Sequence, residues 1–497
     1  MSSGMKILYA SAEVVPFAKT GGLADVAGAL PKVLAGMGHD VRIVMPRYRS
    51  IDGKRFGLHP ITEPFSIPHG DSSIEISIEQ SDAIAGVTMY FIRNDYLYDR
   101  DGLYGHADDD HRFVAYCRGM LEMLPKIGWV PDVINCNDWH TGLTPVYLKT
   151  LYANRPGYSG IGTLYTIHNL AYQGQFSPYI MELAGLPAEL FTWDKLEFWG
   201  QFNFMKAGLV YADKLSTVSE TYAREIQTPE FGAKLEGVLA YRAHDLYGIL
   251  NGIDYHVWNA KTDKLIPKNF TEEHPDGKRH CKHELQREMG LPVKDSAPLF
   301  GIVSRLSAQK GFDLLDETLP KLLEEEDMQV VILGTGEEYF QEMITRLADR
   351  YPDKLAVALK FDDALAHRIY AGSDAFLMPS HYEPCGLGQM ISLAYGTLPV
   401  VHAVGGLADT VKEIKSMRGK GNGFVFEEYM PEALEAAILR TLKCFHDKAN
   451  CWERAVQNGF ASDFSWENSA RKYIKVYKEA VKSARHEEPP EQLKASA

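Results

Sequence analysis

The sequence contains no apolar run that approaches the roughly eighteen residues of a membrane-spanning helix. Its first residues, Met1 to Lys6, lack the basic and long apolar regions of a secretory signal. Six cysteines are scattered along the chain, with no Cys-X-X-Cys pair and no other metal-binding spacing. A chain of 497 residues does not depend on disulfides. These absences predict a reduced cytoplasmic protein with no membrane partner.

The chain also lacks an excess of basic residues. It has 52 Lys and Arg against 66 Asp and Glu, so its formal net charge is −14. Nucleic-acid-binding proteins favour a basic surface, and we therefore expect no nucleic-acid partner. Because the overall field repels anions, a bound phosphate would have to be held by local groups.

What is present is enough apolar material for two hydrophobic cores. Hydrophobic residues make up 45% of the chain, and its length exceeds what one core usually organises. Short apolar runs alternate with helical spacing, which predicts an α/β fold with parallel sheets. The first series begins with a strand at Lys6–Ala12 and a helix at Gly22–Gly38, and the second begins near Pro298.

These patterns predict two doubly wound domains in tandem. We place the first at residues 1–247 and the second at 248–465, with the polar stretch Ala260–Lys294 just after the boundary. The polar tail 486–497 is expected to be disordered. Ligands of such sheets bind beyond the carboxyl ends of the strands, so motifs at those ends are candidates for function.

In the first domain, the residues Lys19-Thr20-Gly21-Gly22-Leu23-Ala24-Asp25 follow the first strand. Adjacent glycines let backbone N–H groups approach a ligand, and a helix start favours an anion. Lys19 adds a positive charge. The motif is not Gly-X-Gly-X-X-Gly, so it gives no support to a dinucleotide site. A tight turn with a surface lysine is an equally good interpretation of this motif by itself.

Two further strands of the first domain end in polar residues. Asn137-Asp138-Trp139-His140 follows Asp132–Cys136, and His168-Asn169 ends the strand Thr163–Ile167. Asp138 is placed to accept hydrogen bonds from sugar hydroxyls, and Trp139 to pack on a sugar face. The alternatives are a helix-capping aspartate beside a core tryptophan and a structural histidine, and the motifs leave them open.

The second domain offers two cations across one strand–helix connection. Arg305 follows the strand Leu299–Val303, and Lys310 lies where the next helix begins. Two cations, backbone donors and a helix amino terminus together suit a diphosphate, and they would stabilise charge on a leaving diphosphate. The alternative is a pair of solvated surface cations.

Two glycine-containing segments follow later strands of this domain. Glu383-Pro384-Cys385-Gly386-Leu387-Gly388 can present backbone N–H groups to phosphate and a carboxylate to sugar hydroxyls. Gly405-Gly406-Leu407-Ala408-Asp409-Thr410 repeats the Gly-Gly-Leu-Ala-Asp pattern of the first domain. We interpret Cys385 as a packing residue or ligand contact rather than a nucleophile.

Seven segments in register resemble one family. KTGGLADV, NDWH, HNLAYQG, NGID, SRL…QKG, EPCGL and GGLADTV occur in this order between Met5 and about Lys482. The chain is similar to bacterial glycogen synthases and plant starch synthases. The resemblance implies a GT-B fold, in which two Rossmann-like doubly wound domains face each other across a deep cleft. It also implies that a last helix, 466–485, returns to the first domain.

The resemblance assigns roles to the motif residues. It implies a catalytic set of Lys310, Arg305, Glu383, His168 and Asp138. It implies donor contacts from Lys19, Gly21, Gly22, Asp25, Phe361, Cys385, Gly386, Leu387, Gly388, Gly405, Gly406, Asp409 and Thr410. It implies acceptor or sugar contacts from Trp139, His140, Asn169 and Tyr104. Phe361, His381 and Val404 stand where family members commonly have Tyr, Arg and Thr.

The resemblance also implies the reaction. Glucose would pass from ADP-glucose to the non-reducing end of an α-1,4-glucan with retention of configuration, without a metal or other cofactor. The family route is a front-face transfer, and Glu383 as a covalent nucleophile ranks second. Sucrose- or trehalose-phosphate-forming relatives often carry a second glutamate eight positions after the first, where this chain has Ile391.

Three points stay open at this stage. The choice of ADP-glucose over UDP-glucose rests on family analogy alone. The oligomeric state is undetermined, and a homo-oligomer is compatible with the sequence. A catalytically idle glucan-binding protein is a rival from another class, and the presence of Lys19, Arg305, Lys310 and Glu383 argues against it.

Overall fold

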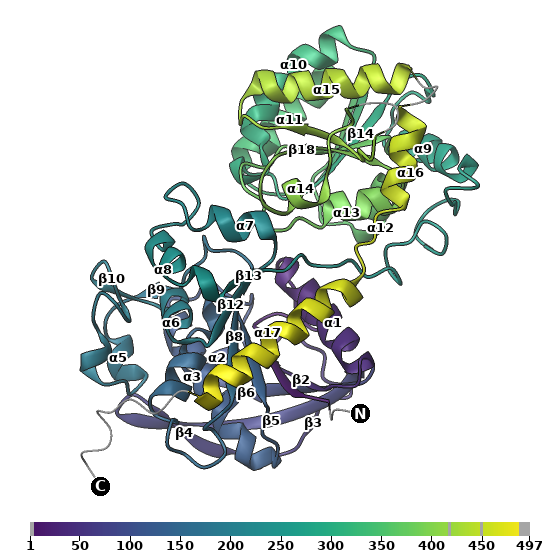
Figure 1. Ribbon diagram of the computed structural model, residues 1–497. Helices are drawn as coiled ribbons and strands as arrows, with labels where there is room; N and C mark the ends of the chain where they lie inside the picture. Colours follow the sequence, from purple (N-terminus) through teal and green to yellow (C-terminus); the bar gives the residue numbers. More distant parts are fainter. Residues whose placement is uncertain (1–3, 416–418, 448–450, 487–497) are drawn as a thin grey trace. The chain divides into compact units, whose positions relative to one another are not determined.

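The chain forms two α/β units in the computed structural model, which describes residues 4–415, 419–447 and 451–486 (Figure 1). The first unit contains the chain up to Val218, then Ala223–Leu250, and finally the C-terminal helix α17 (Trp466–His486). The second contains Ser219–Tyr222 and Asn251–Ser465. All of the predicted tail except His486 lies outside the described residues.

The first unit is built on a largely parallel sheet. Its parallel strands are β1 (Lys6–Ala10), β2 (Asp40–Pro46), β6 (Val87–Arg93), β7 (Val133–Asn137), β8 (Gly162–Ile167), β12 (Lys214–Thr217) and β13 (Leu246–Gly248). Their spatial order is β13-β12-β8-β7-β1-β2-β6. When these parallel strands are numbered in chain order, their spatial order is the Rossmann order with one extra strand. The order reverses between β1 and β7.

One edge of this sheet is antiparallel. β5 (Ser72–Ile84) pairs with β6 and also with β3 (His59–Pro60) and β4 (Phe65–His69). The alternation along β5 explains the edge, since Ile76 and Ile78 are buried while Glu75 is exposed. A separate small sheet consists of β9 (Gln175–Phe176), β10 (Glu197–Phe198) and β11 (Gln201–Asn203), in the order β10-β11-β9.

Helices pack on both faces of the first sheet. The longer ones are α1 (Gly22–Gly36), α3 (Asp109–Ile127), α4 (Leu143–Lys149), α6 (Phe204–Tyr211) and α17. Three short helices, α2 (Asp95–Tyr98), α5 (Ile180–Leu183) and α8 (Glu236–Tyr241), pack on other helices of the unit, and α7 (Glu220–Glu225) begins in the second unit and ends in the first.

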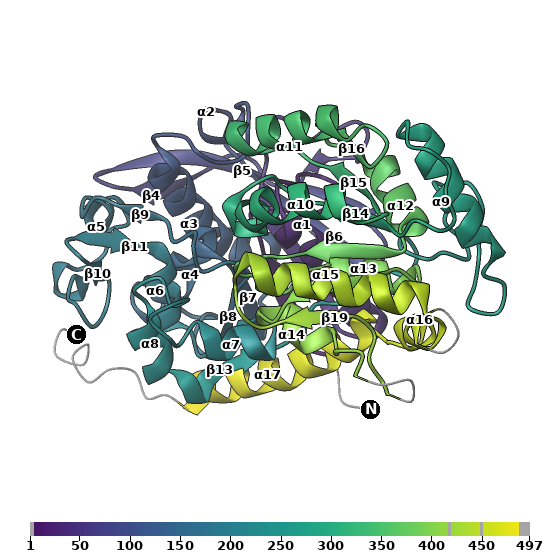
Figure 2. The ribbon, with the colours of Figure 1, turned by 90° about the horizontal axis from the view of Figure 1, so that it is seen from above.

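The C-terminal helix α17, drawn in yellow in Figures 1 and 2, is part of the first unit. It packs on β8 and α1. Its Tyr477 hydroxyl donates a 2.7 Å hydrogen bond to Asn135 of β7, and its Arg485 pairs with Asp132 at 3.1 Å. Both bonds bind the last helix to the strand that carries the Asn137-Asp138 motif.

The second unit has a fully parallel six-stranded sheet. Its strands are β14 (Leu299–Val303), β15 (Gln329–Leu333), β16 (Leu355–Ala358), β17 (Ala375–Met378), β18 (Leu398–His402) and β19 (Phe424–Phe426). The order β16-β15-β14-β17-β18-β19 is the six-stranded Rossmann order, with its reversal between β14 and β17.

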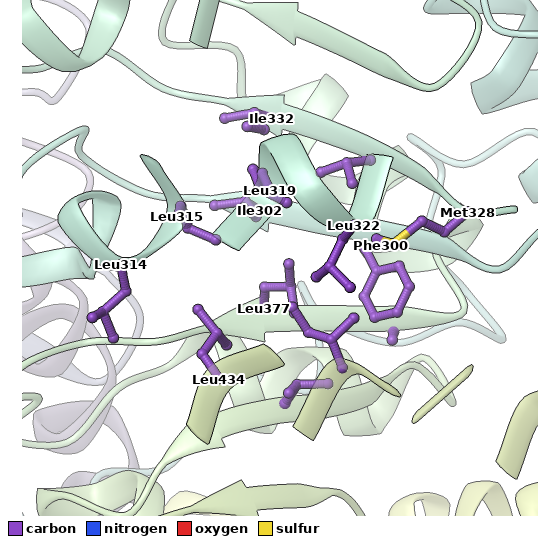
Figure 3. Packing of buried hydrophobic residues seen from close by; sticks show 14 of the residues in the cluster. Phe300, Ile302, Leu314, Leu315, Leu319, Leu322, Met328, Ile332, Leu377 and Leu434 are labelled. Carbon is purple, nitrogen blue, oxygen red and sulfur yellow. The ribbon is translucent and has the colours of Figure 1, made fainter. Parts of the chain in front are cut away.

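Helices on one face of this sheet enclose its main core. α10 (Phe312–Glu325), α11 (Glu338–Arg350) and α15 (Pro431–His446) cover that face, while α12 (Asp363–Gly372) and α13 (Gly388–Ala394) cover the other (Figures 1 and 2). The remaining helices are α9 (Asp276–Glu288), α14 (Gly405–Thr410) and α16 (Trp452–Phe460). Figure 3 shows side chains of this core, including Leu322 of α10 near Phe300 of β14 and Leu319 of α10 near Ile302 of β14. Each such buried side chain contributes about 1.5–3 kcal/mol.

None of the helices in the described part of the chain has both the length and the apolar character that crossing a membrane requires.

Candidate active site

The predicted motifs follow the strands at which each sheet reverses its order. In the first unit, the Lys19–Asp25 segment comes after β1 and Asp138 comes directly after β7. In the second unit, Arg305 follows β14 and Glu383 follows β17. Ligands of open α/β sheets bind beyond the strand ends at this reversal. Each unit therefore presents its motif residues at the position where its fold offers a binding site.

Asp138 and His168 meet in the first unit because β7 and β8 are neighbours. Asp138 is a buried residue with a positive φ of 53°, and its carboxylate accepts the backbone N–H groups of His168 at 2.7 Å and Asn169 at 3.4 Å. Burial raises the pKa of Asp138 to about 7, although both N–H donors oppose the rise. The aspartate is therefore poised between its two protonation states near neutral pH.

The His168 side chain is held by Asn137. Its Nε2 lies 2.9 Å from the Asn137 Oδ1, which also accepts the Tyr9 hydroxyl. Burial lowers the pKa of His168 to about 3, so the imidazole is neutral at physiological pH and Nε2–H donates to the amide oxygen. Asn137 itself was outside the predicted site, although it is the first residue of the NDWH motif.

Trp139 and His140 are stacked on each other and largely buried. Their ring centroids are 4.1 Å apart, and the Tyr104 ring lies 4.4 Å from His140. Only 8% of Trp139 is exposed, and Phe113 packs edge-on against it at 4.8 Å. Burial lowers the pKa of His140 well below its usual value. The structure brings Trp139, His140 and Tyr104, three of the four predicted sugar contacts, together, and their role in sugar binding stays a prediction.

The Lys19–Asp25 loop is organised by Glu13, which the sequence reasoning missed. The buried Glu13 carboxylate accepts the backbone N–H groups of Thr20 and Gly21 and the Tyr104 hydroxyl. The sequence could have indicated Glu13 as a site residue, because it lies just after a buried strand. Lys19 pairs with Asp25 at 2.8 Å, and a Cβ placed on Gly21 or Gly22 would meet no atom within 4 Å. The start of α1 is therefore open to a ligand.

In the second unit, Lys310 and Glu383 form a partly buried ion pair. The Lys310 Nζ is 2.6 Å from the Glu383 carboxylate, which also accepts the Ser380 hydroxyl at 3.0 Å. Arg305 donates to Gln309 at 3.2 Å, one residue before Lys310. Both cations thus precede α10, whose amino-terminal dipole favours an anion.

Gly311 makes this arrangement sterically feasible. It caps α10 with a φ of +80°, and a Cβ there would lie 2.0 Å from the Pro379 carbonyl oxygen. Only glycine adopts this backbone conformation and also allows this approach without strain. The close contact brings the loop after β14 against the loop after β17, which places Lys310 beside Glu383.

The two glycine-containing segments of the second unit pack on each other. The Gly406 N–H donates to the Glu383 carbonyl at 3.1 Å, and a Cβ on Gly405 would lie 1.9 Å from the same oxygen. Asp409 accepts hydrogen bonds from the backbone and hydroxyl of Thr221 at 3.0 and 2.6 Å. The Gly406 N–H and the Asp409 carboxylate thus already have partners within the unit.

The remaining predicted donor contacts divide into buried and exposed residues. Cys385 is buried, and burial raises the pKa of its thiol to about 12, so it stays protonated at neutral pH. Thr410 is also buried and donates to the Gly406 carbonyl at 2.6 Å. Gly386, with a φ of 70°, and Leu387 precede α13, which begins at Gly388. Phe361 lies between β16 and α12 and is 86% exposed, so its ring is accessible for stacking.

Family models match most of the chain. The starch synthase catalytic domain matches residues 6–241, and glycosyl transferases group 1 match residues 288–458. A glycogen synthase from Desulforudis audaxviator is 49% identical, over 97% of this chain and 98% of its own length. The chain belongs to the glycogen synthase family. A second member, from Moorella thermoacetica, is 47% identical over 98% of this chain and 99% of its own.

Solved structures agree with the family and the fold. The catalytic domain of starch synthase IV from Arabidopsis thaliana, bound to ADP and acarbose, matches with a TM-score of 0.90 and 32% identity. This match covers 97% of the present chain and all of that one. Sucrose-phosphate synthase from Thermosynechococcus elongatus matches with a TM-score of 0.56, 19% identity and coverage of 95% and 98%, and shows the fold alone. The predicted family, GT-B fold and hexosyltransferase class are confirmed.

Proposed function

We propose that this protein transfers glucose from ADP-glucose to the non-reducing end of an α-1,4-glucan, retaining the anomeric configuration and elongating glycogen. The observation that carries the proposal is the grouping of Arg305, Lys310 and Glu383 at the start of α10, in a chain of this family. The grouping combines two cations for a phosphate with a carboxylate for a sugar.

The donor would be held chiefly by the second unit. Arg305, Lys310 and the α10 amino terminus suit the diphosphate, and the ammonium of Lys310 would exchange Glu383 for a phosphate oxygen. Phe361 offers an exposed ring for the adenine. Lys19, which pairs with Asp25 at 2.8 Å near the start of α1, is a further candidate for a phosphate contact. Cationic stabilisation of the leaving diphosphate supplies the main rate acceleration in this scheme, which requires no metal.

The sugar and acceptor would be oriented by Asp138 and His168. In the front-face route, the bond between glucose C1 and the phosphate oxygen breaks while the acceptor hydroxyl approaches C1 from the same side. The hydroxyl proton passes to the departing phosphate oxygen. The His168 carbonyl would face the developing positive charge at C1, and Asp138 would accept hydrogen bonds from sugar hydroxyls.

Glu383 is better suited to bind the sugar than to attack it. Its carboxylate accepts the Ser380 hydroxyl at 3.0 Å, a hydrogen bond that would remain when Lys310 turns to the phosphate and that lowers the nucleophilicity of the carboxylate. A covalent route through Glu383 therefore stays the second choice.

A sucrose- or trehalose-phosphate-forming activity is the alternative within this fold. Relatives of that type often carry a second glutamate at the position of Ile391. In this structure Ile391 lies in α13 and is only 4% exposed. This chain has no carboxylate there, which favours the glucan acceptor.

The proposal is tested by incubating the protein and glycogen with labelled ADP-glucose or UDP-glucose and counting label in precipitated glucan. We expect incorporation from ADP-glucose. No incorporation from either donor would refute the function, whereas a preference for UDP-glucose would change the donor alone.

Phe361→Ala should raise the KM for ADP-glucose and leave the KM for the glucan unchanged. Cytoplasmic location, a homo-oligomeric state and the domain limits 1–247, 248–465 and 466–485 stay predictions.

A further inference from the structure

The turn between β10 and β11 carries a tryptophan in a conformation that disfavours one. Phe198 pairs with Gln201, so the hairpin loop consists of Trp199 and Gly200, with φ values of 51° and 78°. Positive φ at both positions is the signature of a type I′ turn, whose first position prefers Asn, Asp or Gly. The indole is 77% exposed, so burial of the ring does not offset the strain.

A lysine with equally unusual backbone lies over this ring. The Lys234 ammonium is 5.5 Å from the Trp199 ring centroid, a cation–π distance. Lys234 and the preceding Ala233 have φ values of 68° and 49°. Among the described residues, the non-glycine positions with positive φ are these three and Asp138. Strained backbone tends to persist at functional sites, because elsewhere it only costs stability.

Hydrogen bonds connect this place to the proposed sugar-binding motifs. Gln173, in the HNLAYQG segment, donates to the Ala233 carbonyl at 2.9 Å and accepts from Asn203 of β11 at 2.7 Å. In the same small sheet, Phe176 of β9 lies 5.7 Å from the Trp139 ring. β10 is two strand spacings from β9, which is roughly 10 Å. Buried contacts of the first unit therefore connect the motif of Asp138 to the hairpin that exposes Trp199.

The tip of this hairpin is held rigidly. The buried Lys206 donates to the backbone carbonyl of Glu197 at 2.6 Å and to that of Trp193. The Glu197 carboxylate accepts the Gly200 N–H at 2.6 Å, inside the turn itself. Trp193, on the same anchored segment, is 81% exposed. A prearranged aromatic surface loses little conformational entropy on binding.

We propose that Trp199 and Lys234 form a docking subsite for the glucan chain, several glucose residues away from the reacting end. The indole would pack on the apolar face of a glucose residue, and the ammonium would donate to a neighbouring hydroxyl. One aromatic ring and one cation are enough to bind a sugar residue. A stable protein interface buries about 1,200–2,000 Å², so a glucan is the better occupant of this site than another protein. The inference rests on the proposed function, since its ligand is the same α-1,4-glucan.

The test compares Trp199→Gly with Tyr96→Ala. Glycine suits a positive φ, so the first variant removes the ring while relieving the strain, and its melting temperature should be no lower than that of the wild type. Tyr96 is the matched control, because it is 80% exposed in the same unit and Arg100 lies 5.4 Å over its ring, but it sits in helix α2. Binding is measured by electrophoresis in gels that contain glycogen, without any donor.

We expect Trp199→Gly to weaken glycogen binding by about tenfold. The KM of this variant for glycogen should rise in parallel, while its kcat and its KM for maltotriose stay within twofold of wild type. The control variant Tyr96→Ala should match wild type in all of these measurements. Unchanged glycogen affinity in Trp199→Gly would overturn the subsite. An equal loss with maltotriose and glycogen would also overturn it, because Trp199 would then act at the transfer centre. The gel assay needs no transfer, so an inactive wild type would refute the proposed function without deciding the subsite.

Discussion

The Lys310 ammonium lies 2.6 Å from the Glu383 carboxylate, although 73 residues separate them in the chain. They belong to the connections that follow β14 and β17, two paired strands at the reversal of the second sheet. A partly buried ion pair of this kind contributes little net stability, because desolvation offsets the attraction. The ion pair is better explained by function, because it positions the Lys310 ammonium where a diphosphate would bind.

Replacing Lys310 by alanine tests this role directly. We expect kcat to fall by about 100- to 1,000-fold, or roughly 3 kcal/mol of transition-state stabilisation, the scale of one oxyanion donor. The measurement is the initial rate of glucan elongation at saturating donor. Lys321→Ala is the control, since Lys321 forms an exposed pair with Glu435 at 2.7 Å and should leave kcat unchanged. A Lys310→Ala rate within threefold of wild type would show that the clamp is assigned wrongly.

Asp138 predicts an unusual dependence of stability on pH. Its pKa is about 7 in the folded protein and near 3.9 when unfolded. Between these values the folded state holds a proton that the unfolded state has lost, so the free energy of unfolding falls as pH rises, up to about pH 7. Asp138→Asn removes this titration. Relative to wild type, the variant should gain about 4 kcal/mol between pH 4 and pH 8.

Chemical denaturation of both proteins across this pH range measures the difference. His168 acts in the opposite direction, because its pKa is lowered to about 3 and its contribution is lost as pH falls below about 6.5. His168 is present in both proteins, so its effect cancels in the comparison. A stability difference that does not change with pH would contradict the buried-carboxylate explanation.

Gly311→Ala should be among the more damaging glycine substitutions. The added Cβ would lie 2.0 Å from the Pro379 carbonyl, at a φ of +80°, so the two loops must separate. We expect a loss of about 2 kcal/mol or more in unfolding free energy, together with lower activity as Lys310 moves away. Gly237→Ala in α8 is the matched control, because its Cβ would meet no atom within 4 Å and should be neutral or stabilising. The melting temperatures of the two variants, measured by thermal unfolding, test this expectation. Equal melting temperatures would refute the steric argument.

Cys385 should resist alkylation in the native protein. With its pKa raised to about 12, on the order of one thiol in ten thousand is ionised at pH 8, and the side chain is buried. Peptide mapping after iodoacetamide treatment should find Cys385 unmodified in the native protein and modified in urea. Cys385→Ala should retain kcat within about tenfold of wild type, because no covalent step passes through the thiol. Rapid alkylation of Cys385 in the native protein would contradict this expectation and would support a nucleophilic role for the thiol.

Several features of the site were predictable because they are local. The Gly21-Gly22 turn, the polar residues after β7 and the cations before α10 each lie within a few residues of a strand with a clear apolar pattern. Hydrophobic periodicity and turn-forming residues act over this short range, so a sequence displays them directly.

Glu13 and Trp199 show what local patterns could not predict. Glu13 matters because its carboxylate meets a loop seven residues later and the Tyr104 hydroxyl ninety-one residues later. Trp199 is notable only once its positive φ, its exposure and the Lys234 ammonium above it are known. Backbone conformation and long-range contacts of this kind leave no periodic signal in the sequence.

By itself, the sequence determined the α/β class, the series of strand–helix connections and, through seven ordered motifs, the family. Only the tertiary structure decided which connections meet: β14 beside β17 brings Lys310 to Glu383, and β7 beside β8 brings Asp138 to His168. The physical reason is that strand pairing is set by packing of the whole sheet, whereas each strand and turn is set by its own residues.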